Sequence, residues 1–393
     1  MKPIIKWPGG KEKELDHILS NLPPRFASYY EPFVGGGSVF AAIEANHSFI
    51  NDKSDELCSL YRNIACKNQM FFDSLKQVSV SWNAMREFAA HTDALCGVFM
   101  SYRKGAIDRG ELARDVDQWL NDKWAMLVGI IPRALSFRLS DYRNELQKNL
   151  VRKLLRMRQI EEVKHMLPEQ DVRNNIATAL MSSLYMYYRG LYNDAAVKSG
   201  TPEIHNALFV FIRNFTYSGM FRYNANGEFN VPYGGMAYNS KSMDPKIDYY
   251  LSDGLGKLFS GTSIDNLDFE EFLKKHAPGE HDFIFLDPPY DTEFSTYAEN
   301  DFTREDHERL ANYLCHDCKA KWMMIIKKTD FILSLYEGHG LHISSFDKKY
   351  QVSFMNRNDR EVMHLMITNY VPSPLSSRHG TPSQVAAMLP GFD

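Results

Sequence analysis

The chain has 393 residues, of which 44% are hydrophobic and 24% are charged, a composition typical of a globular protein with one large or two ordinary domains. It has no apolar run long enough to span a membrane, and residues 1–6 do not form a signal peptide, so we expect a cytoplasmic protein that binds no membrane. The net charge of −4 excludes a protein that is basic over its whole surface. Any contact with nucleic acid must therefore come from a local basic region.

The five cysteines are spread unevenly along the chain, which excludes a disulfide framework and predicts reduced thiols. Cys315 and Cys318 have the spacing of half a zinc site or of a redox pair, but the sequence offers no second pair of cysteines to complete a metal cage, and buried or incidental thiols fit better. We therefore expect no metal ion.

The first motif is the loop at residues 6–11, Lys-Trp-Pro-Gly-Gly-Lys. Gly9 and Gly10 let the backbone approach a ligand, Trp7 offers a packing surface, and Lys11 can meet a carboxylate. Taken alone, this segment is explained more simply as a surface turn.

Residues 28–34 form a short run typical of a strand, followed by three glycines at residues 35–37 and a helical stretch at residues 39–45. A strand, a glycine-rich turn and a helix in this order make the nucleotide-binding unit of a Rossmann-like sheet. The glycines have neither the spacing of a dinucleotide-binding turn nor the Lys-Ser/Thr pair of a phosphate loop. A cofactor without phosphates fits this turn better.

A second strand is predicted at residues 48–50, and Asp52 follows it. An acid at this position is placed to accept hydrogen bonds from both ribose hydroxyls of a nucleoside cofactor. The alternative is a cap for the helix that begins near Ser54.

Residues 66–207 are charged and helix-prone and lack further glycine turns, so we expect a separate helical lobe. Within it, residues 148–158 contain no acid, and Lys148, Arg152 and Arg156 stand one helical turn apart. Such a row is either a solvated helix face or a surface that contacts phosphates.

Two alternating runs flank Asn226-Gly227, which predicts a hairpin with a two-residue turn. That turn would place Arg222 opposite Val231, on the same face as Asn224 and Phe229. A two-stranded ribbon can enter the major groove of DNA, where an Arg can bind guanine in bidentate fashion. A solvent-exposed hairpin with an incidental Arg is the alternative.

A further strand is expected near Leu258 and Phe259, followed by a loop at residues 262–269. In this loop either Asp265 or Asp268 is placed to reach the adenine amino group of a cofactor. Later in the chain, Thr303 opens a helix with a capping box, and residues 321–326 form a buried strand. An antiparallel pair between residues 346 and 370 completes the sheet.

Residues 283–286, Phe-Ile-Phe-Leu, are predicted to form a buried strand that two prolines end abruptly after Asp287. Ligands of open α/β sheets bind at this carboxyl edge. The Asp287 carboxylate and the Pro288 carbonyl are acceptors, and Tyr290 adds a flat ring, so the group suits a planar ligand that bears an NH2, such as adenine. A simple strand terminator is the alternative for the tetrapeptide alone.

Together these segments resemble the DNA adenine-N6 methyltransferases of the Dam-type, D12 class (alpha group). The resemblance rests on residues 6–11, 31–38, 52, 222–232 and 287–290, in that order, and covers roughly residues 1–65 and 210–370. It implies an α/β fold: a Rossmann-like, S-adenosylmethionine-dependent methyltransferase sheet with an inserted, mainly helical target-recognition domain that carries a β-hairpin. The catalytic domain is then residues 1–65 and 250–371, the insertion residues 66–249, and a flexible tail residues 372–393.

The resemblance also implies the activity: transfer of a methyl group from S-adenosylmethionine to the N6 amine of a flipped adenine in double-stranded DNA, with no metal. The protein would act as a monomer, or as a dimer on DNA, in the nucleoid of a bacterium or phage-infected cell, with or without a partner restriction enzyme. The catalytic residues would be Asp287, Pro288 and Tyr290. The cofactor-binding residues would be Trp7, Lys11, Phe33, Gly35, Gly37, Asp52 and Asp287. The DNA-binding residues would be Tyr217, Arg222 and Asn224.

Three departures from the family pattern leave the recognition sequence open: Ser218, Gly235 and the length of the insertion. Methylation of RNA adenine, of a protein amide or of cytosine N4 by the same group of residues, Asp287, Pro288 and Tyr290, remains an alternative. So does a non-catalytic relative that only binds DNA.

Overall fold

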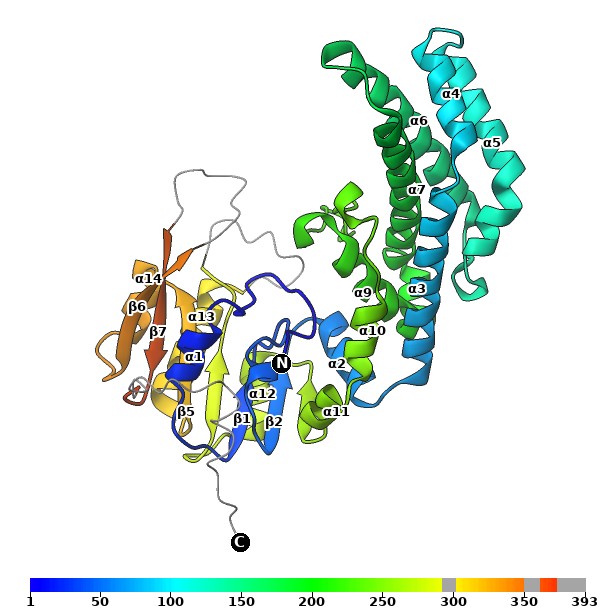
Figure 1. Cartoon of the computed structure of the whole chain (residues 1–393). Helices are drawn as coiled ribbons and strands as arrows, with labels where there is room; N and C mark the ends of the chain where they lie inside the picture. The colour runs from blue at the N-terminus through cyan, green and yellow to red at the C-terminus, as the bar shows by residue number, and fades with distance from the viewer. Residues whose placement is uncertain (292–301, 350–360, 373–393) are drawn as a thin grey trace, which may run out of the picture. The chain divides into compact units, whose positions relative to one another are not determined.

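The computed structural model of the chain describes residues 1–291, 302–349 and 361–372. The chain forms two compact units: residues 1–65 with residues 253–393, which we call the sheet unit, and residues 66–252, which we call the helical unit (Figure 1). Beyond Pro372, the tail predicted at residues 372–393 lies outside the described residues. Within the described ranges, no helix is both long and apolar enough to cross a membrane.

A seven-stranded sheet in the order β3-β2-β1-β4-β5-β7-β6 forms the sheet unit. Its strands are β1 (Ser28–Glu31), β2 (His47–Asn51), β3 (Thr262–Asp265), β4 (Phe283–Leu286), β5 (Lys321–Lys327), β6 (His342–Lys349) and β7 (Glu361–Thr368). Strands β3, β2, β1, β4 and β5 are parallel, whereas β7 is antiparallel to both of its neighbours. This mostly parallel sheet confirms the predicted α/β fold class. The strand order reverses between β1 and β4, the kind of position where open α/β sheets bind ligands.

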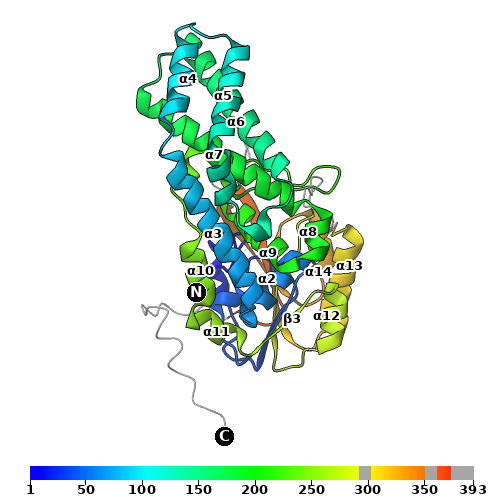
Figure 2. The same cartoon turned by 90° about the vertical axis from the view of Figure 1, so that its right-hand side faces the viewer.

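All four residues of β4 are buried because both faces of the sheet are covered. One face is covered by α12 (Phe269–His276), α13 (Arg304–Asn312) and α14 (Asp330–Tyr336), which lie near one another in Figure 2. Their apolar residues form a buried cluster with Ile284 and Leu286. On the other face, the Phe283 ring packs against Phe26 at 5.4 Å and Tyr370 at 6.4 Å between ring centroids. The continuous apolar run before Asp287 is therefore the sequence of a central strand.

The helix predicted at residues 39–45 is wrong, because only the 3₁₀ turn Phe40–Ala42 forms there. The backbone is already extended at Ile43 (ψ 134°), and β2 begins four residues later, at His47. The connection between the glycine turn and β2 is too short for a regular helix.

The strand predicted near Leu258 and Phe259 is also wrong, because both residues end α11 (Asp253–Phe259). Phe259 packs from this helix against Tyr61 of α2 (Asp55–Ala65), with 6.1 Å between ring centroids. The true strand is β3, inside the segment predicted to be a loop. A short apolar pair does not distinguish a helix from a strand, and no residue of β3 is buried.

The helical unit confirms the predicted helical character of residues 66–207. Its helices are α3 (Gln69–Ala89), α4 (Asp93–Arg103), α5 (Arg109–Ile130), α6 (Leu139–Val163), α7 (Glu169–Tyr192), α8 (Ala195–Gly200), α9 (Pro202–Phe215) and α10 (Asp244–Leu251). Helix α7 packs against α3, α6 and α9, so it forms the centre of the unit. A hairpin at residues 216–234 follows α9.

Candidate functional site

The carboxyl ends of β1 and β4 leave the sheet side by side, because Tyr30 pairs with Ile284 in parallel register. The glycine turn, residues 35–37, follows β1, and Asp287 follows β4. The structure therefore brings the two predicted halves of the site to one edge of the sheet, at the point where the strand order reverses.

Lys11 links the amino-terminal loop to this edge. Its side chain is only 2% exposed, and its Nζ forms an ion pair with the Asp287 carboxylate. The same Nζ donates hydrogen bonds to the Tyr290 hydroxyl (3.1 Å) and the Gly9 carbonyl (3.0 Å). Loss of one partner would leave a largely buried charge, so this contact holds the loop against Asp287. Lys11 thus joins the amino-terminal loop to residues 287–290, although Lys11 and Asp287 are 276 residues apart in the sequence.

Tyr290 is held on a second side by His364, a residue that the sequence analysis did not single out. His364 is fully buried on β7, and its Nε2 lies 3.1 Å from the Tyr290 hydroxyl. The two rings meet edge to face at 5.4 Å. The only local signal was one polar residue inside the apolar run of β7. Its contact with Tyr290 depends on tertiary structure that local sequence does not show.

The glycine turn packs closely against Trp7. Gly35 has φ +48°, and a Cβ placed on it would lie 3.0 Å from Trp7 Cδ1. Gly37 has φ +70°, and its Cβ would lie 3.2 Å from the Tyr61 hydroxyl, so a side chain at either position would be strained and crowded. Ile4 donates its backbone N–H to the Gly36 carbonyl (3.0 Å), which ties the amino-terminal segment to the turn.

Asp52 lies directly beside the same turn. Its Oδ2 accepts the backbone N–H of Gly35 and its Oδ1 that of Ser54, both at 2.9 Å. The carboxylate therefore fixes both the glycine turn and Ser54, the residue that precedes α2. Burial raises the pKa of Asp52, and these backbone hydrogen bonds oppose the rise. Each carboxylate oxygen keeps a further lone pair, so Asp52 can still accept hydroxyl donors.

Asn51, which precedes Asp52 and was also missed, holds the loops around the site together. Its buried Nδ2 donates to the carbonyls of Pro32 (3.0 Å) and Leu267 (3.1 Å). Its Oδ1 accepts the Leu267 N–H (2.9 Å). The segments that follow β1 and β3 are thereby fixed to the end of β2.

Glu31, at the end of β1, adds a third carboxyl group to this edge, and its side chain is buried. It accepts a hydrogen bond from the Tyr29 hydroxyl at 2.7 Å. Burial raises the pKa of Glu31 well above its usual value, and the charges of Asp287 and Asp52 raise it further. The neutral form of Glu31 is therefore kept to a higher pH than in a free carboxyl group.

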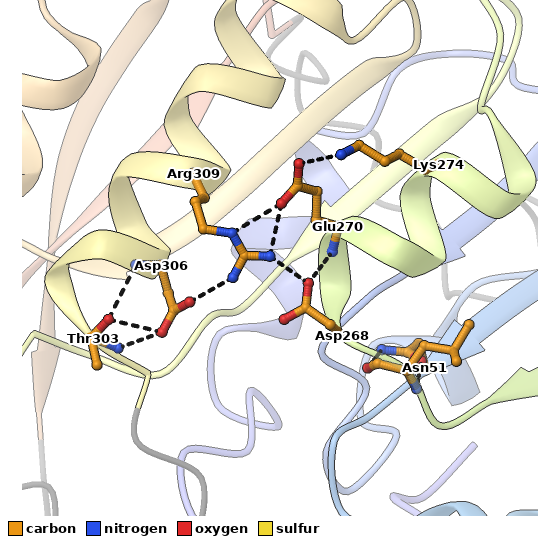
Figure 3. A network of polar contacts seen from close by, with 8 residues as sticks. Asn51, Asp268, Glu270, Lys274, Thr303, Asp306 and Arg309 are labelled. Atoms are coloured by element: carbon orange, nitrogen blue, oxygen red, sulfur yellow. Dashed lines mark hydrogen bonds and ion pairs between the residues drawn. The ribbon is translucent and has the colours of Figure 1, made fainter.

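Of the two acids left open at residues 262–269, Asp265 is the last residue of β3 and binds Lys275 and His276, with 2.6 Å between side-chain atoms in each pair. Asp268 caps α12 and pairs with Arg309 at 2.7 Å in the network of Figure 3. The residue after Asp268 is Phe269, whose ring lies 5.6 Å from that of Phe33. Of the two acids, Asp268 is therefore the one whose neighbour in sequence, Phe269, packs against the predicted cofactor residue Phe33.

The hairpin of the helical unit has a different register from the one predicted. The backbone N–H of Asn230 donates to the Arg222 carbonyl at 3.1 Å, so Arg222 lies opposite Asn230 and not opposite Val231. This shift of one residue turns Phe229 to the other face, where it is fully buried. Arg222 and Asn224 remain on the more exposed face.

The register changes because the turn contains three residues, not two. The Oδ1 of Asn224 accepts the backbone N–H groups of Asn226 and Glu228, both at 3.0 Å. Gly227 adopts φ +73°, which is typical of the last position of a three-residue hairpin turn. The Asn-Gly signal predicted a hairpin correctly, but the side chain before it selected the longer turn.

Helix α7 and its C-cap residue, Asn193, hold the hairpin through side-chain contacts. Tyr185 Oη and Arg189 Nη1 donate to the Val231 carbonyl at 3.0 and 3.2 Å. Asn193 pairs with Phe229 in both directions: its Nδ2 donates to the carbonyl (3.0 Å), and its Oδ1 accepts the N–H (2.9 Å). The exposed face of the hairpin is thus presented by a fixed backbone.

Tyr217, at the start of the hairpin, is 42% exposed. Its backbone N–H donates to the Pro232 carbonyl at 2.9 Å, and the next residue, Ser218, has φ +51°. The predicted DNA-binding residues Tyr217, Arg222 and Asn224 therefore all lie on this one hairpin.

Comparison with known proteins agrees with a methyltransferase sheet. A family model described as D12 class N6 adenine-specific DNA methyltransferase matches residues 7–109 and 134–352. The chain is 26% identical over 378 residues to the type II methyltransferase M.CviBI of Paramecium bursaria Chlorella virus NC1A, a match that covers 94% of this chain and 100% of that protein.

Two further relatives come from cellular organisms. Identity to the type II methyltransferase M.MjaIII of Methanocaldococcus jannaschii is 25% over 389 residues, covering 94% of this chain and 99% of the relative. Identity to the DNA adenine methylase of Escherichia coli (strain K12) is 21% over 317 residues, covering 79% and 74%. The chain belongs to the D12 class of N6 adenine-specific DNA methyltransferases. This membership confirms the predicted family and the coarse activity, methylation of adenine in DNA.

Proposed function

We propose that the protein transfers a methyl group from S-adenosylmethionine to the N6 amine of an adenine that is flipped out of double-stranded DNA. The observation that carries this proposal is the position of Asp287: a carboxylate fixed by Lys11 at the end of β4, beside the glycine turn that follows β1. The sheet unit is then the catalytic domain, and the helical unit is the target-recognition domain.

The residues around the glycine turn suit this cofactor. Close packing of Trp7 on Gly35, and the spare lone pairs of Asp52, suit a ribose and a sulfonium, and the turn lacks the Lys-Ser/Thr pair that phosphates require. The cofactor would supply an electrophilic methyl group. The residues that would hold it are Trp7, Lys11, Phe33, Gly35, Gly37, Asp52 and Asp287. Of the two acids at residues 262–269, we assign the contact with its adenine to Asp268, which lies next to Phe269 and near Phe33.

In this mechanism the Asp287 carboxylate and the Pro288 carbonyl accept the two N–H hydrogens of the adenine amine. The amine lone pair is delocalised into the ring, and two acceptors on one side favour a pyramidal nitrogen whose lone pair is free to attack. Asp287 can accept from Lys11 and from the amine together, because a carboxylate offers about four lone-pair sites. The proton that leaves the nitrogen after methyl transfer passes to the Asp287 carboxylate. Tyr290 would stack on the extruded base.

Flipping the base costs a few kcal/mol of stacking and pairing energy, which contacts to the duplex must supply. We assign these contacts to the hairpin. Arg222 would bind a guanine of the site, Asn224 would contact DNA beside it, and Tyr217 would fill the gap left by the flipped base.

The test is transfer of tritiated methyl groups to duplex DNA, RNA and protein offered as competing acceptors. We expect label in the N6 position of DNA adenine, and none after Asp287→Ala, with the fold and duplex binding retained. The exposed Asp330, which follows the neighbouring strand β5, provides the matched control Asp330→Asn, expected to keep wild-type turnover. Preferred labelling of RNA, protein or cytosine N4, or normal turnover of Asp287→Ala, would refute the proposal.

A further inference from the structure

Charge is divided unequally between the two units. Residues 66–252 contain 24 Lys and Arg against 19 Asp and Glu, a net charge of +5. Residues 1–65 and 253–393 contain 21 against 30, a net charge of −9. Affinity for the DNA backbone comes mainly from contacts between cationic side chains and phosphates, so these contacts are to be sought in the helical unit.

Three exposed cations of α6 form a row on this unit: Lys148, Arg152 and Arg156, which we call the α6 basic row. Residues four apart on a helix lie on the same face. The opposite face of α6 is buried through Leu146, Leu150, Leu154 and other residues. The row is therefore the solvent face of a 25-residue helix whose other face is anchored in the core.

The side-chain partners of the row leave its charge available. Arg152 bonds to the amide oxygen of Asn149 (2.6 Å), and Arg156 to that of Gln159 (3.3 Å). In the described parts of the chain, no ion pair includes either arginine, and Lys148 is 3.7 Å from Glu145. Each of the two arginines is thus hydrogen-bonded to a neutral amide, and in the described residues no carboxylate neutralises its charge.

Other arginines on and near α6 are paired differently. Arg143 contacts Asp117 at 2.6 Å, and Arg158 contacts Glu162 at 3.3 Å. Arg152 and Arg156 thus differ from Arg143 and Arg158 in having a neutral side chain as partner. The positive charge of the row also acts on the neighbouring Lys153. Burial lowers the pKa of Lys153, and the charge of Arg152 lowers it further.

The α6 basic row and the hairpin are both attached to the helical pair α6 and α7: the row lies on α6, and the hairpin is bound to α7. Ser183 of α7 donates to the Glu145 carbonyl of α6 at 3.1 Å, whereas the hairpin contacts α7 further on, from Tyr185 to Asn193. From Glu145 to Arg156 the helix advances roughly 16 Å. The row itself spans about 12 Å, which is the rise of three to four base pairs of duplex.

We propose that the α6 basic row binds phosphates of the duplex beyond the base pairs that the hairpin contacts. This inference rests on the proposed function, since it takes duplex DNA as the ligand of the helical unit. The role of the row is sequence-independent: it adds affinity and length to the footprint but no base preference.

The experiment compares wild type with the double variant Arg152→Gln/Arg156→Gln. Binding to a mixed-sequence duplex of about 40 base pairs is measured over a range of salt concentrations. Each lost phosphate contact lowers the slope of log K against log salt by about 0.9, so we expect a decrease of roughly 1.8. The matched control Arg158→Gln, in which the lost cation is already paired with Glu162, should keep the wild-type slope. Equal thermal midpoints for all three proteins establish that folding is unchanged.

An unchanged slope in the double variant would make the row a solvated helix face and overturn the inference. An equal decrease in Arg158→Gln would also overturn it, because the effect would then be one of net charge. Both outcomes leave the proposed function intact as long as wild type methylates the duplex. Failure of wild type to methylate any duplex DNA would instead refute the proposed function.

Discussion

Replacing Asn193 by Ala removes both hydrogen bonds that fix Phe229 of the hairpin to α7, at 3.0 and 2.9 Å. Phe229 is fully buried, so its N–H and carbonyl would be left without these partners. A buried polar group that loses its partner costs about 1–3 kcal/mol, and we expect the hairpin to be destabilised locally by about 2–4 kcal/mol. The packing of α7 against α3, α6 and α9 does not involve these two hydrogen bonds, so the helical unit should remain folded.

Hydrogen exchange of the Phe229 amide measures this change directly. Since every 1.4 kcal/mol is a factor of ten, exchange should accelerate roughly 30- to 1,000-fold in Asn193→Ala. The matched control is Asn230→Ala, which removes only the acceptor of Arg222 Nε on the exposed face of the hairpin. Protection of Phe229 should be retained in that variant.

The same substitution tests whether the hairpin confers sequence specificity. Once the methylated sequence has been mapped, we expect Asn193→Ala to lower the ratio of kcat/KM between the cognate site and single-base variants, while methylation of poor sites changes little. Unchanged protection of Phe229 together with unchanged discrimination would refute the reasoning that α7 fixes the recognition surface.

Three further predictions concern the sheet unit. Lys11→Met keeps the length of the side chain but removes the partner of the Asp287 carboxylate, and breaking such a buried pair should lower the free energy of unfolding by about 3 kcal/mol and methyl transfer with it; equal urea midpoints for variant and wild type would contradict this. His364→Ala should raise KM for DNA and lower kcat while cofactor affinity stays normal, because His364 orients Tyr290 from β7, which β4 and β5 separate from β1; weakened cofactor binding in calorimetry would contradict this. Glu31→Gln should be more stable than wild type at neutral pH, because the raised pKa of Glu31 makes its contribution to stability present at low pH and progressively lost above pH 4.5; urea unfolding should show the difference between the two proteins shrinking toward pH 4.5, and a difference independent of pH would count against it.

Three elements with a strong local signal were predicted correctly, whereas the helix at residues 39–45 and the strand near Leu258 were not. The strand before Asp287 is apolar throughout because it is central in the sheet, and two prolines end it. The same holds for β5 and for the helix that Thr303 caps with Asp306. In each case the signal lies in a few adjacent residues, and burial on both faces or a cap explains it.

The parts that depend on tertiary pairing were not predictable. β3 was missed because Thr262–Asp265 has no buried residue and no apolar alternation. Asn51 and His364 owe their positions to strand order and loop packing, which bring together segments far apart in the sequence. The hairpin register depended on one side chain, Asn224, whose bonds selected a three-residue turn.

The two places where the chain leaves and re-enters the sheet unit lie next to each other. Helix α2 precedes the departure and α11 follows the return, and Tyr61 packs against Phe259 between them. The intervening 187 residues therefore begin and end at neighbouring points, while β2 and β3 still pair in parallel register across the interruption. Such an arrangement lets the inserted unit lengthen, shorten or be exchanged without altering the pairing of the strands on either side of it, because both of its ends attach at one place.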